Sequence, residues 1–514
     1  MIQPEDNQDL LLSFLNNNQP IQQGHIGIEK ESLRIHKSKV STTPHDQFLG
    51  NSLCNSYITT DFSEAQIELI TPPFNNGKHT ISFLDDLHHY ATNKIGDEYF
   101  WPLSMPIKTS SDSEIPIATY GRSNLGVFKE VYRKGLSHRY GHAMQIISGI
   151  HFNYSFPELI QSIFSLGTDQ TLNKELTSAV YFRTIRNLHR MNWLILYLFG
   201  CSPVISKNLL NSSYNFIPLS KDYYFLPYAT SLRMSDLGYQ NNSQSSLFVS
   251  LNTLEEYTAD LQAATAEPSK LFHKIFSNDV GSYPQISSNL LQIEDEHYGI
   301  ARPKSMVDSN DRQTSKLLLS GVNYIEYRSM DINPFSRVGV EFNDLIFLEA
   351  FIIYCALQSS PPMSSSEFSN VSKNDLIVAT RGREPKIKLK KGGKLIDLKS
   401  WAYKIFDEIT PIIELMGYQS FNIENYRSRL TDPELTLSAS LLRKLREEKI
   451  DYYDLGQQIG MNNKNHYMNK GKDSNPNWAL LKQEEEESSN RNKLLESSSL
   501  DTFEQYVENY FSES

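Results

Sequence analysis

Cysteine is scarce in this chain, with only three among its 514 residues. Cys54, Cys201 and Cys355 lie far apart, so the sequence contains neither a disulfide framework nor a CxxC motif for zinc or redox chemistry. We therefore expect a protein of the reducing cytoplasm.

Long hydrophobic runs are also missing. The most apolar stretch, residues 193–199, ends at Gly200, and a second one at residues 345–357 is interrupted by Glu349. Both are shorter than the ~20 residues that a membrane-spanning helix needs. The N-terminus carries acidic residues where a secretory signal would carry Lys or Arg. We expect no association with a membrane.

Positive charge is not in excess, because 49 Lys and Arg residues face 60 Asp and Glu residues and the formal net charge is −11. The chain has no dense basic block that could follow a phosphate backbone, which disfavours nucleic acid as a partner. Hydrophobic residues make up 39% of the chain and aromatic residues 11%. A chain of this composition can bury a substantial core, which excludes global disorder.

The familiar Gly-rich nucleotide motifs are absent too. The nearest approach to a P-loop, residues 121–126, is followed by Val127 instead of Lys. No GxGxxG follows a predicted strand, and neither GxSxG nor HExxH occurs. Any nucleotide must therefore bind outside these cradles.

Hydrophobic periodicity predicts a mixture of strands and helices. Strands are expected at residues 27–35, 66–71, 150–156, 247–252 and 323–332, and helices at residues 10–15, 81–96, 172–199 and 340–357, with a helix N-cap at residues 363–367.

The composition changes after about Gly382, where a basic, turn-containing segment at residues 386–400 precedes helical sequence. The Asn-rich residues 462–477 and the acidic run at residues 484–487 predict peripheral, solvated segments. A last amphipathic helix is expected at residues 502–511.

The most informative pattern is a set of carboxylates on strand faces. Glu29 and Glu31 are two apart in GIEKESLRI, so they share one face of the strand with Leu33 and Ile35. Two like charges on an inward face repel, and a divalent cation such as Mg²⁺ relieves this because it takes carboxylate oxygens. The alternative is an edge strand with both acids in water.

Three further strands present polar groups. Glu68 lies on a predicted strand that follows Asp61. Asp61 could belong to the site, or it could cap the preceding turn. Glu326 and Arg328 share a face, either as a neutralised surface pair or as a metal ligand beside a phosphate clamp. His151 lies on the polar face of the cleanest alternation in the chain, where a lone His more often has a structural hydrogen bond. Together the four strands indicate metal-assisted chemistry on an anionic substrate.

At these residues the sequence resembles the proteobacterial type of glutamate–cysteine ligase. The resemblance covers roughly residues 24–367. It is carried by many long blocks in order, among them GIEKESLRI, ITTDFSEAQIELITP, YGRSNLGVFKEVYRKGLSHRYGHAMQIISGIHFNYSF, YFRTIRNLHR, LPYATSLRMSDLGYQNNSQS, LQIEDEHYGIARPK, GVNYIEYRSMDINPFSRVGV and PPMSSSE.

The resemblance implies the first step of glutathione biosynthesis. ATP would phosphorylate the γ-carboxylate of L-glutamate, and L-cysteine would attack the acyl phosphate to give γ-glutamylcysteine, ADP and phosphate. It also implies an α+β fold similar to glutamine synthetase, with a curved, mainly antiparallel sheet inside surrounding helices. We expect a catalytic core at residues 8–385, a mainly helical extension at residues 386–514, a monomer, and glutathione as a possible feedback inhibitor.

Site roles carry over by position. The metal site, for Mg²⁺ with Mn²⁺ as an alternative, would use Glu29, Glu31, Asp61, Glu68, His151 and Glu326. Glu326 and Arg328 would act in catalysis, and Arg328 would also bind ATP by stabilising charge on the transferring phosphoryl group. The substrate-binding residues would be Tyr132, Arg133, Leu136, Gln145, Arg233, Tyr239 and Tyr298.

Two alternatives remain open. A ligase of the same fold that joins glutamate to ammonia or another amine would keep the acids and change the cysteine pocket. A non-catalytic regulator that binds glutamate or a nucleotide should have lost one or more acids.

Overall fold

The computed structural model describes residue 15 and residues 20–157, 174–238, 247–275, 283–307, 311–498 and 501–512. The helix expected at residues 10–15 lies largely outside these residues. Among the described residues, no helix is both long and apolar enough to cross a bilayer.

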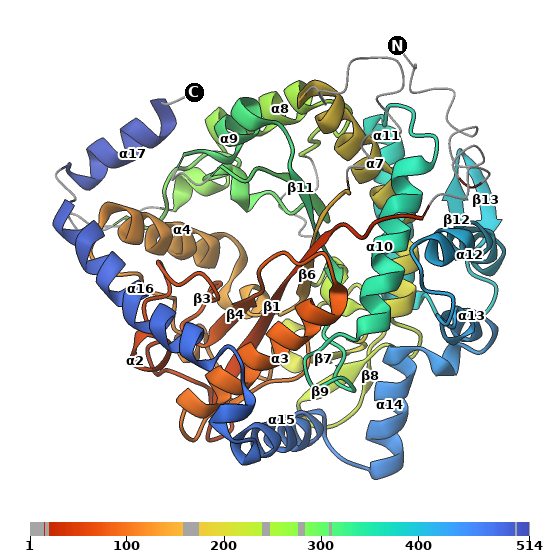
Figure 1. Ribbon diagram of the computed structural model, residues 1–514, viewed down its shortest axis with the longest axis horizontal. Helices are drawn as coiled ribbons and strands as arrows, with labels where there is room; N and C mark the ends of the chain where they lie inside the picture. Colours follow the sequence, from red (N-terminus) through yellow and green to blue (C-terminus); the bar gives the residue numbers. More distant parts are fainter. Residues whose placement is uncertain are drawn as a thin grey trace.

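A central antiparallel sheet organises the molecule (Figure 1). Its strands lie in the order β10 (Ala301–Lys304), β11 (Tyr324–Met330), β6 (Ile150–Ser155), β1 (His25–His36), β4 (Gln66–Ile70) and β3 (Ile58–Thr60). Two short strands, β2 (Lys39–Val40) and β5 (Tyr99–Phe100), pair with β1. The expected α+β class with a mainly antiparallel sheet is confirmed, and so are the four strands that carry the acids and His151.

Helices cover the sheet because its apolar side chains need a partner layer. The long helix α7 (Lys174–Phe199) packs against α10 (Phe342–Leu357) and α11 (Ser365–Arg381), and it also contacts β10 and β11. Helix α3 (Gly77–Lys94) lies against β1 and β4. Ser364 caps α11 by accepting a hydrogen bond from the Glu367 amide, as the sequence predicts.

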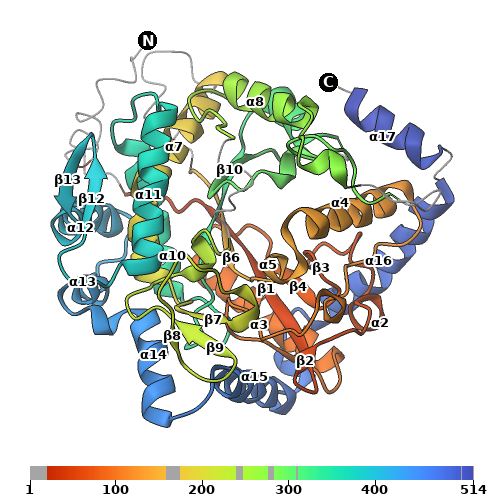
Figure 2. The same ribbon diagram turned by 180° about the vertical axis from the view of Figure 1, so that it is seen from behind.

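Further elements surround the central sheet, seen from behind in Figure 2. They are helices α2 (Asp46–Leu49), α4 (Asn124–Tyr140), α5 (His142–Gln145), α8 (Leu254–Ala266) and α9 (Gln313–Ser320), and a separate sheet of β7 (Val204–Ser206), β8 (Ile217–Pro218) and β9 (Tyr223–Phe225).

The strand expected at residues 247–252 is wrong. The segment is irregular and leads into the Thr253 cap of α8. Its carbonyl groups are bonded by an arginine instead of a neighbouring strand, because Arg186 donates to the oxygens of Leu251 and Asn252, each at 2.9 Å. The buried guanidinium of Arg186 thus satisfies carbonyl groups that a neighbouring strand would bond if this segment were the predicted strand.

The C-terminal part begins with a hairpin of β12 (Lys388–Lys391) and β13 (Lys394–Asp397). Helices α12 (Leu398–Leu415), α13 (Glu424–Thr431), α14 (Leu437–Glu448), α15 (Tyr452–Asn469), α16 (Trp478–Ser498) and α17 (Phe503–Ser512) follow. The large core cluster runs from Ile21 to Leu481, so the extension packs on the same core as the sheet. The boundary near residue 385 stays a prediction.

The Asn-rich segment is mostly exposed, as expected, but two of its side chains anchor it to α3. Asn475 donates to the Asp86 carbonyl at 2.9 Å, and Asn477 donates to the Asp86 carboxylate at 2.8 Å. In the acidic run, Glu485 accepts from the hydroxyl of Tyr90 at 2.6 Å. These polar side chains satisfy buried groups of α3, which a reading of composition alone could not show.

Candidate active site

A cavity of about 520 Å³ opens over one face of the central sheet. Strands β1, β4, β6, β10 and β11 and the connection from β3 to β4 form its floor, and α4 forms one of its walls. Every residue proposed from the sequence lines this cavity except Tyr239, which lies outside the described residues. Residues from both the metal set and the substrate set therefore surround a single space.

Strand pairing brings the acids together. Glu31 lies directly opposite Glu68 in the β1–β4 ladder, and Glu29 lies opposite His151 in the β1–β6 ladder. Glu326 is the register partner of Asn153 in the β11–β6 ladder. Because β1 is an inner strand, the alternative of an edge strand with both acids in water does not apply.

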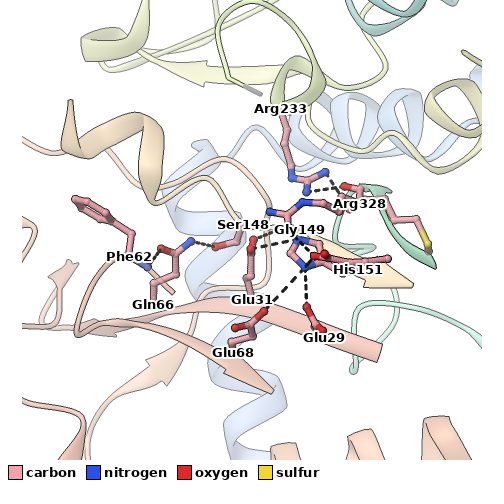
Figure 3. A network of polar contacts seen from close by, with 12 residues as sticks. Glu29, Glu31, Phe62, Gln66, Glu68, Ser148, Gly149, His151, Arg233 and Arg328 are labelled. Atoms are coloured by element: carbon pink, nitrogen blue, oxygen red, sulfur yellow. Dashed lines mark hydrogen bonds and ion pairs between the residues drawn. The ribbon is translucent and has the colours of Figure 1, made fainter. Parts of the chain in front are cut away.

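His151 lies at the centre of the acids (Figure 3). Its Nδ1 atom is 3.0 Å from Glu29 Oε2, 3.4 Å from Glu326 Oε1 and 4.0 Å from Glu68 Oε1. The Nε2 atom is 3.5 Å from Glu31 Oε1. One ring thus reaches all four carboxylates.

The donor set fits a hard divalent cation. Two groups of three side chains have ligand atoms within 4.8 Å of one another, and His151 belongs to both. The first group adds Glu29 and Glu326, and the second adds Glu31 and Glu68. The Nε2 atom of His151 is buried and has no hydrogen-bond partner among the described residues. An orphaned nitrogen beside clustered carboxylates is the arrangement that Mg²⁺ or Mn²⁺ would complete.

The ionisation of the acids differs between the two sides of the cluster. Burial raises the pKa of the Glu68 carboxyl well above its ordinary value, and the neighbouring Glu29 and Asp61 charges raise it further. Burial likewise raises the pKa of Glu31. Arg233 and Arg328 lower the pKa of Glu31 only in part, so burial and the neighbouring acids prevail in both carboxyl groups.

Basic residues dominate the other side. Burial raises the pKa of Glu326, but the charges of Arg328, Lys304 and Arg302 outweigh it and hold this pKa well below its ordinary value. Arg328 forms an ion pair with Glu326, and Lys304 Nζ lies 3.0 Å from Glu326 Oε2. Glu326 is only 2% exposed, so the alternative of a neutralised surface pair does not apply.

Arg233 positions the strand that carries Arg328. Its guanidinium donates to the carbonyl of Arg328 at 2.9 Å and to that of Met330 at 3.2 Å. It lies directly over Gly149, where an added Cβ would come within 2.0 Å of its Nη2 atom. Only a residue without a side chain leaves room for this approach.

A second wall is built from aromatic and amide side chains. Tyr132 and Leu136 lie one turn apart on α4 and both line the cavity. Gln145 at the end of α5 donates from Nε2 to the hydroxyl of Tyr298 at 3.0 Å. The structure thus gathers the described residues of the predicted cysteine subsite.

Arg133 and Asp61 are in contact through the Asp61 backbone. Arg133 donates to the backbone carbonyl of Asp61, and its guanidinium lies 4.6 Å from the ring centre of Tyr120. The Asp61 side chain lines the cavity, but it belongs to neither of the two compact ligand groups. A role for Asp61 as a metal ligand therefore has less geometric support than the roles of the other acids.

Several basic residues of the cavity were missed from the sequence, notably Lys129, Arg302 and Lys304. Arg302 lies opposite Glu326 in the β10–β11 ladder. Arg302 and Lys304 are two apart in the strand ARPK, the spacing that identified Glu29 and Glu31. That signal was available, whereas Lys129 is one of many lysines on helices and had none.

The family model described as glutamate–cysteine ligase matches residues 11–378. A glutamate–cysteine ligase of Pseudomonas fluorescens strain Pf-5 is 39% identical over 436 residues, which cover 82% of this chain and 81% of that protein. One from Aliivibrio fischeri strain MJ11 is 42% identical over 430 residues, covering 81% and 82%.

Solved structures of the same family and of a related enzyme are also similar to this chain. A crystal structure of glutamate–cysteine ligase from Francisella tularensis in complex with AMP superposes with a TM-score of 0.90 at 32% identity, covering 96% of this chain and 98% of that one. A bifunctional glutathione synthetase from Pasteurella multocida shares the fold with a TM-score of 0.66 at 24% identity, covering 90% of this chain and 53% of that one.

Proposed function

The chain belongs to the glutamate–cysteine ligase family, and on that premise we propose how its residues carry out the reaction. It is an ATP-dependent ligase that joins L-glutamate to L-cysteine in the first step of glutathione biosynthesis. In the proposed course, the γ-carboxylate of glutamate attacks the terminal phosphorus of ATP and ADP leaves. The amine of cysteine then attacks the acyl phosphate, loses a proton, and phosphate leaves.

Glu29, Glu31, Glu68, Glu326 and His151 would hold Mg²⁺, with Mn²⁺ as a possible substitute. A divalent cation bound there would neutralise phosphate oxygens, which would allow one anion to attack another. The side chains themselves fix where the phosphates lie, since each acid is attached to a strand that is paired on both sides.

Arg328 and Glu326 form the proposed catalytic pair. The Glu326 carboxylate fixes the Arg328 guanidinium through their ion pair, and Arg233 holds the Arg328 backbone by donating to its carbonyl oxygen. A guanidinium whose position is fixed in this way can stabilise charge on a phosphoryl group without reorganisation. Lys304 adds a second cation on this side.

Cysteine would bind against Tyr132, Arg133, Leu136, Gln145 and Tyr298, with Tyr239 as a further candidate. The Tyr298 hydroxyl, oriented by Gln145, can donate to the substrate. Aromatic rings provide an apolar surface for the small, polarisable thiol.

The single observation that carries the proposal is that the acid cluster, the cations Arg328 and Lys304 and the aromatic wall surround one cavity. The test uses purified protein with Mg²⁺, ATP and glutamate, and follows ADP release after cysteine or ammonia is added. Cysteine-dependent release is expected. Turnover with ammonia alone would indicate a different amine acceptor, and no turnover with either would favour a binding regulator.

Three wider properties are also proposed from the family resemblance. These are a cytoplasmic location, a monomeric state and inhibition by glutathione. The unpaired state of all three cysteines supports the first of these.

A further inference from the structure

The last helix, α17, lies against the cavity, although all the residues proposed above precede it by more than a hundred positions. Its partly buried residues fall three and four apart on one face: Phe503, Tyr506, Val507, Tyr510 and Phe511. Glu504, Gln505, Glu508 and Asn509 are exposed on the other side. This is an amphipathic helix whose apolar face has a definite partner.

That partner is α4, beside which α17 lies in both views (Figures 1 and 2). The ring centre of Phe128 is 4.7 Å from that of Tyr510 and 5.8 Å from that of Tyr506. Both tyrosines also line the cavity. The start of α17 is held to α4 because Asn124 donates from its amide to the Asp501 carbonyl at 2.9 Å.

The position of Phe128 gives this contact a consequence. Phe128, Tyr132 and Leu136 are spaced by four residues, so they form one ridge along α4. The same ridge carries two of the residues proposed to contact cysteine. The acids and Arg328, in contrast, are held by the strand ladders of the central sheet. A change in α17 should therefore affect one substrate and spare the other two.

We propose that α17 forms the outer wall of the cysteine subsite, and that Tyr510 is the positioning residue that holds the Phe128–Tyr132 ridge against bound cysteine. This inference rests on the proposed function. The ring of Tyr510 makes the contact, so its hydroxyl is not required.

The experiment measures the KM for each of the three substrates. Tyr510→Ala is expected to raise the cysteine KM by about 3- to 10-fold. The kcat and the KM values for ATP and glutamate should change less than about twofold. Tyr510→Phe keeps the ring and should match the wild type, and so should Glu508→Gln on the exposed face of the same helix. An unchanged cysteine KM in Tyr510→Ala, or an equal rise in all three KM values, would overturn the proposal.

Loss of folding can be separated from loss of the wall. No residue of α17 is fully buried, so Tyr510→Ala should keep the melting temperature of the wild type. If the wild type shows no cysteine-dependent ADP release, the proposed function and this inference fall together. If Tyr132→Phe raises the cysteine KM while Tyr510→Ala does not, the subsite stands and only the wall is disproved.

Discussion

Glu31 and Glu68 are directly opposite each other on neighbouring strands, and both side chains face the cavity. Two carboxylates in this position repel each other, and burial makes the repulsion stronger. The His151 ring, whose Nε2 atom is 3.5 Å from Glu31, forms a compact group of ligands with both acids. The pair is therefore stable in its ionised form only when positive charge is supplied.

Divalent cations should stabilise the folded protein. Mg²⁺ at about 100 times its dissociation constant is expected to add about 3 kcal/mol to the free energy of unfolding, which raises the melting temperature by roughly 2 to 3 °C in a chain of this size. Glu29→Gln should lose most of this shift, whereas Glu130→Gln on the outside of α4 should keep it. The measurement is thermal unfolding with EDTA or Mg²⁺ in the absence of substrates. An equal shift in Glu29→Gln would remove Glu29 from the metal site.

Removing the charge of Glu326 should abolish turnover. Glu326→Gln is expected to lower kcat at least about 100-fold, because Arg328 and Lys304 lose the carboxylate that orients them and the metal loses a ligand. Glu326→Asp keeps the charge and should retain more activity. ADP release gives the rate, and circular dichroism checks the fold. Near-normal turnover of a folded Glu326→Gln protein would rule out the assigned role.

Tyr298→Phe should mainly raise the KM for cysteine. The substitution removes the hydroxyl that accepts a hydrogen bond from Gln145. Loss of one such contact is worth about 1 kcal/mol, which corresponds to a roughly 5-fold rise in the cysteine KM. Tyr403→Phe, which removes a hydroxyl bonded to Thr431 on a remote helix, is the matched control. An unchanged cysteine KM would count against contact between Tyr298 and this substrate.

The folded protein should lose stability as the pH rises toward the pKa of Glu349, a buried carboxyl group on α10. Burial raises the pKa of Glu349 to about 7, although the Gly24 amide and the Tyr154 hydroxyl donate to it. The unfolded chain releases this proton near its ordinary pKa of 4.5, while the folded chain keeps it until about pH 7. The contribution is therefore full at pH 4 and is lost between pH 4.5 and 7, with a total of about 3 kcal/mol.

Glu349→Gln keeps both hydrogen bonds and removes the titration. From pH 5 to pH 8 the wild type should lose more stability than this variant, as measured by the melting temperature. Glu408→Gln is the control, because Glu408 also accepts from a tyrosine, Tyr354, at 2.6 Å but is half-exposed. Parallel curves for the wild type and Glu349→Gln would contradict the assignment.

Strand alternation was enough to predict which face of each central strand is polar. It identified Glu29 with Glu31 and Glu326 with Arg328 because the period of two is local to the chain. It could not order the strands, since register depends on pairing between separate segments, which lie more than a hundred residues apart for β1 with β6 and for β6 with β11. The closeness of His151 to four acids is therefore a result of the fold, and the metal roles themselves stay a prediction.

The C-terminal part was the least predictable. Asn475 and Asn477 look solvated by composition, yet their amides bond to Asp86 on α3. Likewise the periodicity of α17 predicts a helix but not the ridge of α4 on which it packs. In both cases the partner lies hundreds of residues earlier, and no local pattern encodes such a distance.

The alternation of β1 also has a consequence for folding. Glu29 and Glu31 face the cavity, while Lys30 faces the opposite side, where its Nζ atom lies 2.8 Å from His88 Nε2. A slip of one residue would place Lys30 among the cavity residues and bury the two acids beneath α3. Such a misregistered sheet would be destabilised on both faces at once. The charges that serve the reaction therefore also favour the correct register of the strands that form the site.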